Sequence, residues 1–279
     1  MITPSDVERW LREDVGHHDV TNQVPGDTEG RLVAKEAGTV AGLDAARAVF
    51  SYLDCEVRGT SKRGGETAEH AEAGDRIEPG DVVLEVTGSA REILRGERVA
   101  VNVVGHASGI ATKTHDAVQA TGDHDTRIAG TRKTTPGLRG VEKRAVAAGG
   151  GDTHRLDLSH MVMVKDNHVA AMGLDGAISH FRERASFATK LDVEVEAVED
   201  APRAAEYGAD IVLLDNMTPA ETERAAELVA ETDGETLTEA SGGITVETVP
   251  DYAATGVDII SMGALTHSAP TLDLSFRTG

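Results

Sequence analysis

The feature that most constrains the fold is a repeat in the second half of the chain, where short apolar runs end in polar residues or glycine. The runs are RIAGTRKT, MVMVKDNH, LDVEVE, DIVLLDN, TLTEASGG and DIISMG. Their end markers, Thr131, Lys165, Glu194, Asp215, Ser241 and Gly263, are 34, 29, 21, 26 and 22 residues apart. Segments with helical periodicity fill the gaps. This alternation predicts βα units, a parallel sheet, and functional side chains at the carboxyl ends of its strands.

The widest gap leaves room for one more strand near AVAAGGG, at residues 145–151. About seven strands would form an α/β barrel short of the usual eight. We therefore expect a barrel domain over 108–267 and an N-terminal domain over 1–107, with the tail 268–279 as a candidate to pack back on the latter. A helix is predicted over 3–15, and a helix break between Gly105 and Gly109 marks the domain boundary.

Charge is distributed unevenly along the chain, which has 48 acidic and 27 basic residues and a net charge of -21. The segment Thr126–Lys165 carries eight bases against three acids, or +5, so the remainder carries -26. Such a cationic segment indicates an anionic ligand held by arginine forks and backbone amides. A basic helix face is the alternative, which the interleaved glycine, proline and threonine residues disfavour.

The whole-chain composition argues for a cytoplasmic protein. Excess acid disfavours binding of nucleic acid or anionic membranes by the bulk surface, and suits a salt-rich cytoplasm, where ions screen self-repulsion. We therefore expect a halophilic source. Cys55 is the single cysteine, which excludes an intrachain disulfide and a thiolate zinc site. No apolar run reaches the length of a signal or membrane helix.

The side chains at the strand ends are of three kinds. Glu194 and Asp215 are hard oxygen ligands that suit Mg²⁺. Glu196 shares the strand face of Glu194 by the period of two, so both are expected to point inward. Bare backbone amides follow two strands, at 241–243 and 262–264, where a phosphate could bind, although Gly-Gly turns are common in βα units. Cations able to neutralise carboxylates and phosphates are Arg132, Lys133, Arg139, His154, Arg155, Lys165 and His168.

In their order and approximate spacing, several motifs resemble those of the quinolinate phosphoribosyltransferase family. The resemblance spans nearly the whole chain and is carried by ERVAVN, GIAT, GTRKTTPGLR, GGGDTHR, MVMVKDNH, VEVE, LLDNM, EASGGI and GVDIISMGALTHS. It implies an N-terminal α/β sandwich, an incomplete α/β barrel of type II phosphoribosyltransferases, and a homodimer in which each barrel faces the neighbour's N-terminal domain. The implied reaction joins quinolinate to phosphoribosyl pyrophosphate (PRPP) with Mg²⁺, giving nicotinate mononucleotide, pyrophosphate and CO₂.

The resemblance also implies roles for individual residues. Catalysis would fall to Lys133, Lys165, Glu194 and Asp215, of which Glu194 and Asp215 would hold Mg²⁺. Periodicity alone indicates that Arg98 is a surface arginine, whereas the resemblance implies that it enters the partner's site. The substrate-binding set would be Arg98, Thr131, Arg132, Lys133, Arg139, His154, Arg155, Lys165, Glu194, Asp215, Ser241, Gly242, Gly243, Gly263 and His267.

One position departs from the family pattern, and two other functions remain as alternatives. Gly130 stands where the family usually has Asp. A transferase of the same fold could act on nicotinate or another planar acid, but the paired cations favour a substrate with a second carboxylate. A non-catalytic anion-binding protein is disfavoured by the complete set of Lys165, Glu194 and Asp215. After transfer, Lys165 or a nearby cation is expected to stabilise the electron pair left at the ring carbon by decarboxylation.

Overall fold

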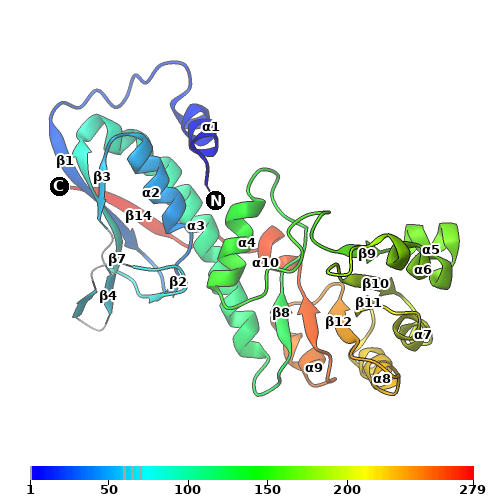
Figure 1. Ribbon diagram of the computed structural model, residues 1–279. Helices are drawn as coiled ribbons and strands as arrows, with labels where there is room; N and C mark the ends of the chain where they lie inside the picture. The colour runs from blue at the N-terminus through cyan, green and yellow to red at the C-terminus, as the bar shows by residue number, and fades with distance from the viewer. Residues whose placement is uncertain (1, 59–60, 64–65, 69–70) are drawn as a thin grey trace. The chain divides into compact units, whose positions relative to one another are not determined.

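The computed structural model describes residues 2–58, 61–63, 66–68 and 71–279, which form two compact units (Figure 1). The first unit comprises Met1–His115, Thr135–Gly150 and Ala269–Gly279, and the second comprises Asp116–Thr134 and Gly151–Ser268. The division is therefore not a single cut at residue 107, because a segment inside the expected barrel range groups with the first unit.

The first unit contains an antiparallel sheet in the order β14-β1-β7-β3. Leu32 of β1 lies opposite Leu84 on one side and Phe276 on the other. The last strand of the chain is therefore the neighbour of the first (Figure 1). The described strands of this unit are β1 (Asp27–Ala34), β2 (Gly38–Thr39), β3 (Glu56–Arg58), β4 (Ser61–Arg63), β5 (Glu66–Ala68), β6 (Arg76–Ile77), β7 (Val82–Ser89) and β14 (Leu274–Thr278).

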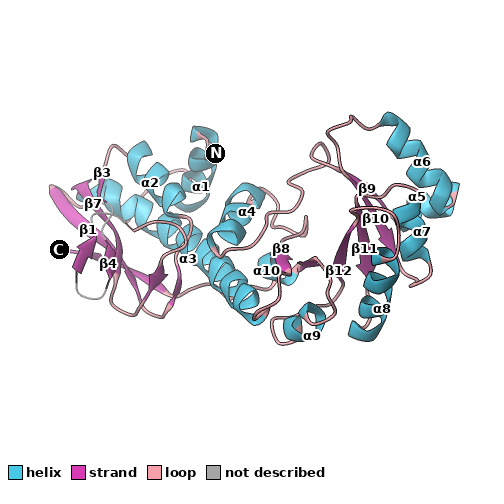
Figure 2. Ribbon diagram, turned by 60° about the horizontal axis from the view of Figure 1, so that its bottom comes forward, coloured by secondary structure: helices cyan, strands magenta, loops and turns pink. Residues whose placement is uncertain are grey.

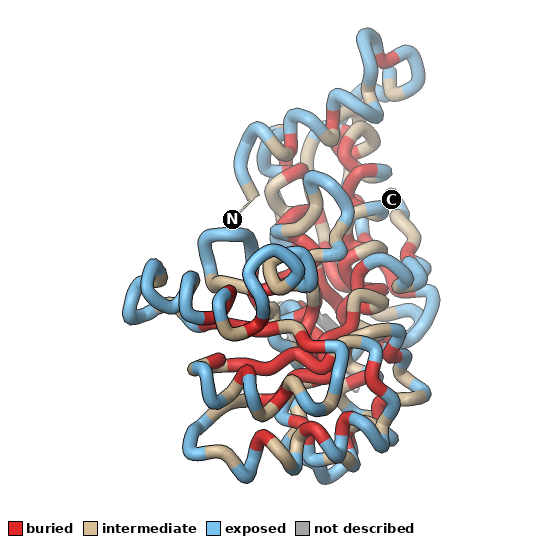
Figure 3. The backbone as a smooth tube through the Cα atoms, turned by 90° about the vertical axis from the view of Figure 1, so that its right-hand side faces the viewer, coloured by how far each residue is buried: buried red, intermediate tan, exposed pale blue. Residues whose placement is uncertain are grey.

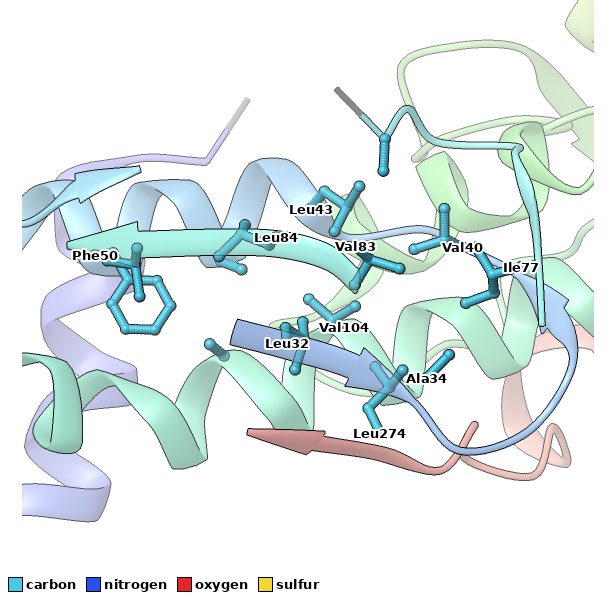
Figure 4. Close-up of a cluster of buried hydrophobic side chains, with 14 of the residues drawn as sticks. Leu32, Ala34, Val40, Leu43, Phe50, Ile77, Val83, Leu84, Val104 and Leu274 are labelled. Atoms are coloured by element: carbon cyan, nitrogen blue, oxygen red, sulfur yellow. The ribbon is translucent and has the colours of Figure 1, made fainter. Parts of the chain in front are cut away.

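Apolar side chains from the sheet and helices form the core of the first unit (Figure 4). Leu32, Phe50, Leu84 and Val104 are all fully buried there. Burial of a side chain of this size contributes about 1.5–3 kcal/mol. The predicted N-terminal helix is confirmed, and Thr3 caps it. The helices are α1 (Pro4–Val15), α2 (Leu43–Tyr52), α3 (Ala90–Ala120), whose last residues belong to the second unit, and α4 (Arg139–Ala148).

The helix α3 runs for 31 residues without interruption, so the predicted break between Gly105 and Gly109 is wrong. These glycines allow the C-terminal segment to approach the helix backbone. The Leu272 amide donates to the Gly105 carbonyl at 3.0 Å. A Cβ at Gly109 would collide with the Pro270 carbonyl, so only glycine fits there. Despite this length, neither α3 nor any other described helix is apolar enough to cross a membrane.

The second unit is built on a parallel sheet of six strands in the order β8-β13-β12-β11-β10-β9. Helix α6 packs on β9 and β10, α7 on β10 and β11, α8 on β12, and α9 on β13 (Figure 2). Buried residues gather on the strands and exposed residues on the outer helix turns (Figure 3). The elements are β8 (Arg127–Ala129), β9 (Val162–Val164), β10 (Leu191–Val195), β11 (Ile211–Asp215), β12 (Leu237–Ser241), β13 (Ile259–Ser261), α5 (Asp166–Met172), α6 (Leu174–Arg184), α7 (Asp200–Glu206), α8 (Pro219–Ala230), α9 (Val249–Ala253) and α10 (Ala264–His267).

The expected additional strand at 145–151 is not formed. Residues 145–148 end α4, and the chain that follows contributes a single parallel bridge between Asp152 and Ala129. Three successive glycines have no side chains to pack in a strand and lose much backbone entropy there. In the described part of the chain the edge strands β8 and β9 do not pair, so the sheet stays open. The α/β fold with an incomplete barrel is as predicted.

Candidate functional site

The second unit encloses a cavity of about 540 Å³ at the carboxyl ends of its parallel strands. All predicted substrate-binding residues line this cavity except Arg98 and Arg139, which belong to the first unit. Arg98 is exposed on α3, and Arg139 is the first residue of α4. The lining residues that were predicted are Thr131, Arg132, Lys133, His154, Arg155, Lys165, Glu194, Asp215, Ser241, Gly242, Gly243, Gly263 and His267.

The strand register brings these residues together. Asp215 at the end of β11 lies opposite Ser241 at the end of β12, and Ser241 lies opposite Ser261 at the end of β13. Glu194 is paired with Leu213, two positions before Asp215. Residues distant in the chain therefore meet at one edge because all the strands run in the same direction.

Cationic side chains form one wall of the cavity. Arg155 is only 8% exposed, and its Nη2 donates to the Met163 sulfur at 3.0 Å. Burial, and next the charge of Arg132, lowers the pKa of Arg155 below its ordinary value. Lys165, directly after β9, is ion-paired with Glu194. Arg155 is thus a partly desolvated cation, which attracts an anionic ligand more strongly than a solvated one.

His168 was expected among these cations but does not line the cavity. Its Nδ1 accepts a hydrogen bond from the Lys165 amide at 2.9 Å, and its ring lies edge-on to Phe181 at 5.2 Å between centroids. His168 therefore anchors the start of α5, and with it the backbone of Lys165.

Two carboxylates, Glu194 and Asp215, line the same cavity. Glu194 is 11% exposed, and Asp215 accepts a hydrogen bond from the Asn216 side chain at 2.7 Å. Their oxygens are of the type that Mg²⁺ prefers, and each carboxylate retains a second oxygen for a ligand. Glu196 is exposed beyond the end of β10, so its predicted inward orientation is wrong: the strand period ends at Val195.

Two glycine turns form another part of the cavity lining. Gly242 has a φ of 101°, and a Cβ there would lie 2.8 Å from the Asn216 backbone nitrogen. A Cβ at Gly263 would lie 2.9 Å from the Lys133 side chain. Backbone amides at such turns can face a phosphate closely because no side chain stands in the way.

Two buried carboxylates close to the cations of the cavity, Asp192 and Glu239, were not predicted. Asp192 is 0% exposed and Glu239 1% exposed, and His154 Nε2 lies 2.9 Å from Glu239 Oε2. Burial, and next the charge of Glu239, raises the pKa of Asp192 well above its ordinary value. Ligand atoms of His154, Asp192 and Glu239 lie within 4.8 Å of one another, a spacing that suits a metal. However, the positively charged Arg155 already interacts favourably with both Asp192 and Glu239.

A sequence signal for these two residues exists. Asp192 precedes Glu194 by two residues, and Glu239 precedes Ser241 by two, so each shares the strand face of a residue that was recognised. Other cavity-lining residues carried no charge pattern that could have marked them, namely Met163, Leu213, Ile244, Thr245 and Ser261.

Replacement of Asp192 by asparagine is expected to stabilise the protein at high pH. The pKa of Asp192 is raised by folding, so the folded state binds its proton more tightly than the unfolded state. Wild-type stability should therefore fall as pH rises from about 4 through the raised pKa, whereas Asp192→Asn lacks this loss. Thermal unfolding from pH 4 to pH 8 should show a Tm difference that grows with pH. A constant difference would contradict the expectation.

Known proteins match this chain over both units. Family models of the N-terminal and C-terminal domains of quinolinate phosphoribosyl transferase match residues 19–108 and 110–277, respectively. The probable nicotinate-nucleotide pyrophosphorylase (carboxylating) of Bacillus subtilis is 42% identical over 273 residues, covering 96% of this chain and 91% of that protein. The human nicotinate-nucleotide pyrophosphorylase (carboxylating) is 41% identical over 276 residues, covering 97% and 90%. The crystal structure of NadC from Streptococcus pyogenes superposes with a TM-score of 0.90 at 40% identity, covering 99% and 97%. The chain therefore belongs to the quinolinate phosphoribosyl transferase family.

Proposed function

We propose that this protein transfers the phosphoribosyl group of PRPP to quinolinate with decarboxylation, giving nicotinate mononucleotide, pyrophosphate and CO₂. This is the carboxylating nicotinate-nucleotide pyrophosphorylase reaction of NAD biosynthesis. The observation that carries the proposal is the convergence of Arg132, Lys133, Arg155 and Lys165 on one cavity that also holds Glu194 and Asp215. Quinolinate has two carboxylates and PRPP has three phosphate groups, one at C5 and two at C1, so both substrates need several cations and backbone amides to neutralise them.

The depth of the cationic groups suggests how the two substrates divide the cavity. Arg155 and the His154 side chain are about 8% and 9% exposed, whereas the Lys165 side chain is 44% exposed. We assign the small planar quinolinate to the buried floor at His154 and Arg155. The 5′-phosphate of PRPP is assigned to the glycine turns at Gly242 and Gly263. Glycine has no side chain, so a phosphate can approach the backbone amides of these turns.

The transfer step needs stabilisation of two opposite charges. The pyrophosphate leaves with negative charge, which Lys133 and Lys165 would stabilise, while the ribose becomes oxocarbenium-like and would be stabilised by Glu194. The pyridine nitrogen attacks with its own lone pair, so no general base is required. The carboxylates of Glu194 and Asp215 fit Mg²⁺, which when bound would neutralise charge on the leaving pyrophosphate.

The proposed reaction is tested by incubating the protein with PRPP and Mg²⁺ and with either quinolinate or nicotinate. Pyrophosphate and nicotinate mononucleotide should form with quinolinate. Turnover of nicotinate alone would favour the related transferase, and ligand binding without pyrophosphate release would favour an anion-binding protein. The assay should be run at several salt concentrations.

We also propose that the enzyme is halophilic and cytoplasmic. The protein has a net charge of -21, which suits a salt-rich solvent, and a single, buried cysteine, which suits a reducing compartment.

We further propose a homodimer in which Arg98 completes the site of the partner subunit. Equal amounts of inactive Arg98→Ala and Lys133→Ala chains should then regain about a quarter of wild-type activity, because half of the dimers are mixed and each has one intact site. Activity is measured after subunit exchange is confirmed by native mass spectrometry. Mixed dimers without activity would contradict the shared site.

A further inference from the structure

Glu239 is a buried carboxylate that the proposed transfer step does not use. It lies on β12, two residues before the end of the strand, and lines the floor of the cavity while being only 1% exposed. Its Oε2 is 2.9 Å from His154 Nε2, and its Oε1 has no hydrogen-bond partner in the part of the chain that the structure describes. Burial of a carboxylate costs free energy unless the group is paired or hydrogen-bonded, so the contact of Glu239 with His154 is the interaction that justifies its burial.

His154 is held firmly from its backbone side. It has a φ of 52°, in the left-handed region that residues other than glycine seldom adopt. Its amide donates to Asp152 Oδ1 at 2.6 Å. Asp152 in turn is joined to β8, through its own amide to the Ile128 carbonyl at 2.8 Å and through its carbonyl to the Gly130 amide at 2.9 Å. The backbone of His154 is therefore fixed relative to the sheet.

The contact with Glu239 then fixes the ring itself. We assign the hydrogen of this contact to His154 Nε2, because a carboxylate oxygen accepts hydrogen bonds. Nδ1 is consequently the ring nitrogen that remains for a ligand in the cavity. Because β12 is an interior strand of the sheet, the contact joins the loop between α4 and β9, which carries His154, to the interior of the sheet.

We propose that Glu239 is a positioning residue for quinolinate binding, which acts by holding the imidazole of His154 with Nε2–H toward β12 and Nδ1 toward the substrate. A quinolinate carboxylate only accepts hydrogen bonds, so the ring that binds it is the doubly protonated one, in which Nδ1–H donates. The proposal rests on the proposed function, in which quinolinate occupies the floor at His154 and Arg155. Glu239 therefore affects the affinity for quinolinate more than the affinity for PRPP. An acceptor that orients a histidine in this way controls both its tautomer and its direction.

Steady-state kinetics of Glu239→Gln test the proposal. The KM for quinolinate should rise about tenfold or more, as expected for loss of a hydrogen bond to a charged group, while the KM for PRPP stays within about twofold. In a His154→Gln background, the same Glu239→Gln change should have almost no further effect on the quinolinate KM, because the partner is already absent. Equal rises in both KM values, or full additivity of the two substitutions, would overturn the proposal.

The first unit provides a matched control. His106 Nε2 lies 2.9 Å from Glu142 Oε1, and Glu142 is 0% exposed, so this pair repeats the contact outside the cavity. Glu142→Gln should lower the Tm without changing the ratio of the two KM values. The same change of ratio in Glu142→Gln would show a general structural effect and overturn the positioning role. If Glu239→Gln is too unstable to purify, Glu239→Asp withdraws the carboxylate by one methylene and is judged by the same outcomes.

A measurement without substrates separates this proposal from the proposed function. In protein labelled with ¹⁵N-histidine, the His154 signals, assigned with His154→Gln, should show a protonated Nε2 in wild type and a changed tautomer distribution in Glu239→Gln. An unchanged distribution would overturn the positioning role even in an active enzyme. A changed distribution in a protein that does not turn over quinolinate would show that Glu239 orients His154 and would reject the proposed function.

Discussion

Replacement of Lys165 by alanine is expected to lower the rate of nicotinate mononucleotide formation about a thousandfold, the loss seen when one preorganised charged donor is removed from an active site. Lys165 lines the cavity and pairs with Glu194, so in the proposed reaction its loss would remove a cation from the leaving pyrophosphate and would leave Glu194 without this partner. Release of pyrophosphate and of CO₂ should be measured separately. If Lys165 also stabilises the electron pair formed by decarboxylation, CO₂ release will fall more than pyrophosphate release.

Lys190→Ala is the matched control. Lys190 is exposed and directly precedes β10, so it lies at the amino end of the strand adjacent to β9. The same charge is removed at the opposite edge of the sheet, and activity should be unchanged. Equal losses of pyrophosphate and CO₂ release in Lys165→Ala would reject a separate role in decarboxylation. A similar loss in Lys190→Ala would reject the assignment of catalysis to the carboxyl edge.

Replacement of Gly242 by alanine is expected to raise the KM for PRPP about a hundredfold, because a displacement of the turn near 1 Å misplaces the phosphate. The Gly242 φ of 101° is strained for alanine, and the added Cβ would meet Asn216 at both its backbone and its side chain. The Asn216 side chain in turn donates a hydrogen bond to Asp215, so a displacement of Asn216 would also move a proposed Mg²⁺ ligand. Steady-state kinetics with varied PRPP, together with the Tm, measure the effect.

Gly256→Ala is the matched control, because it introduces the backbone strain of a positive φ without the collision that a Cβ at Gly242 would make with Asn216. Gly256 also has a positive φ, of 82°, but a Cβ there would meet nothing within 4 Å. This variant should lose about 1 kcal/mol of unfolding free energy while its KM for PRPP stays unchanged. If Gly256→Ala raises the KM for PRPP as Gly242→Ala does, the effect comes from lost stability and not from the phosphate turn.

The strands of the second unit and most of the cavity were predictable because apolar runs that end in polar residues reflect a physical requirement of parallel sheets. Glu194 and Asp215 were recognised because they stand at such ends. Asp192 and Glu239 were missed because a charge inside an apolar run is most simply read as exposed. Their burial depends on residues from other loops and strands, such as His154. The sequence pattern of a single strand does not reveal such contacts.

The continuous course of α3 could not be predicted from local sequence. Glycine within a helical pattern indicates either a break or a close backbone approach, and the segment that approaches Gly105 and Gly109 lies at the far end of the chain. Similarly, α4 has an ordinary amphipathic pattern, and its grouping with the first unit follows from contacts such as that between His106 and Glu142.

The pairing of β14 with β1 has a consequence for how the chain folds during synthesis. Leu32 leaves the ribosome long before its partner Phe276 is made. The second unit is contiguous except for residues 135–150 and can assemble in the interval. The first unit must wait with one side of β1 unpaired, a state that is prone to wrong strand pairing. The unit that contains β1 therefore begins before the second unit and is completed after it.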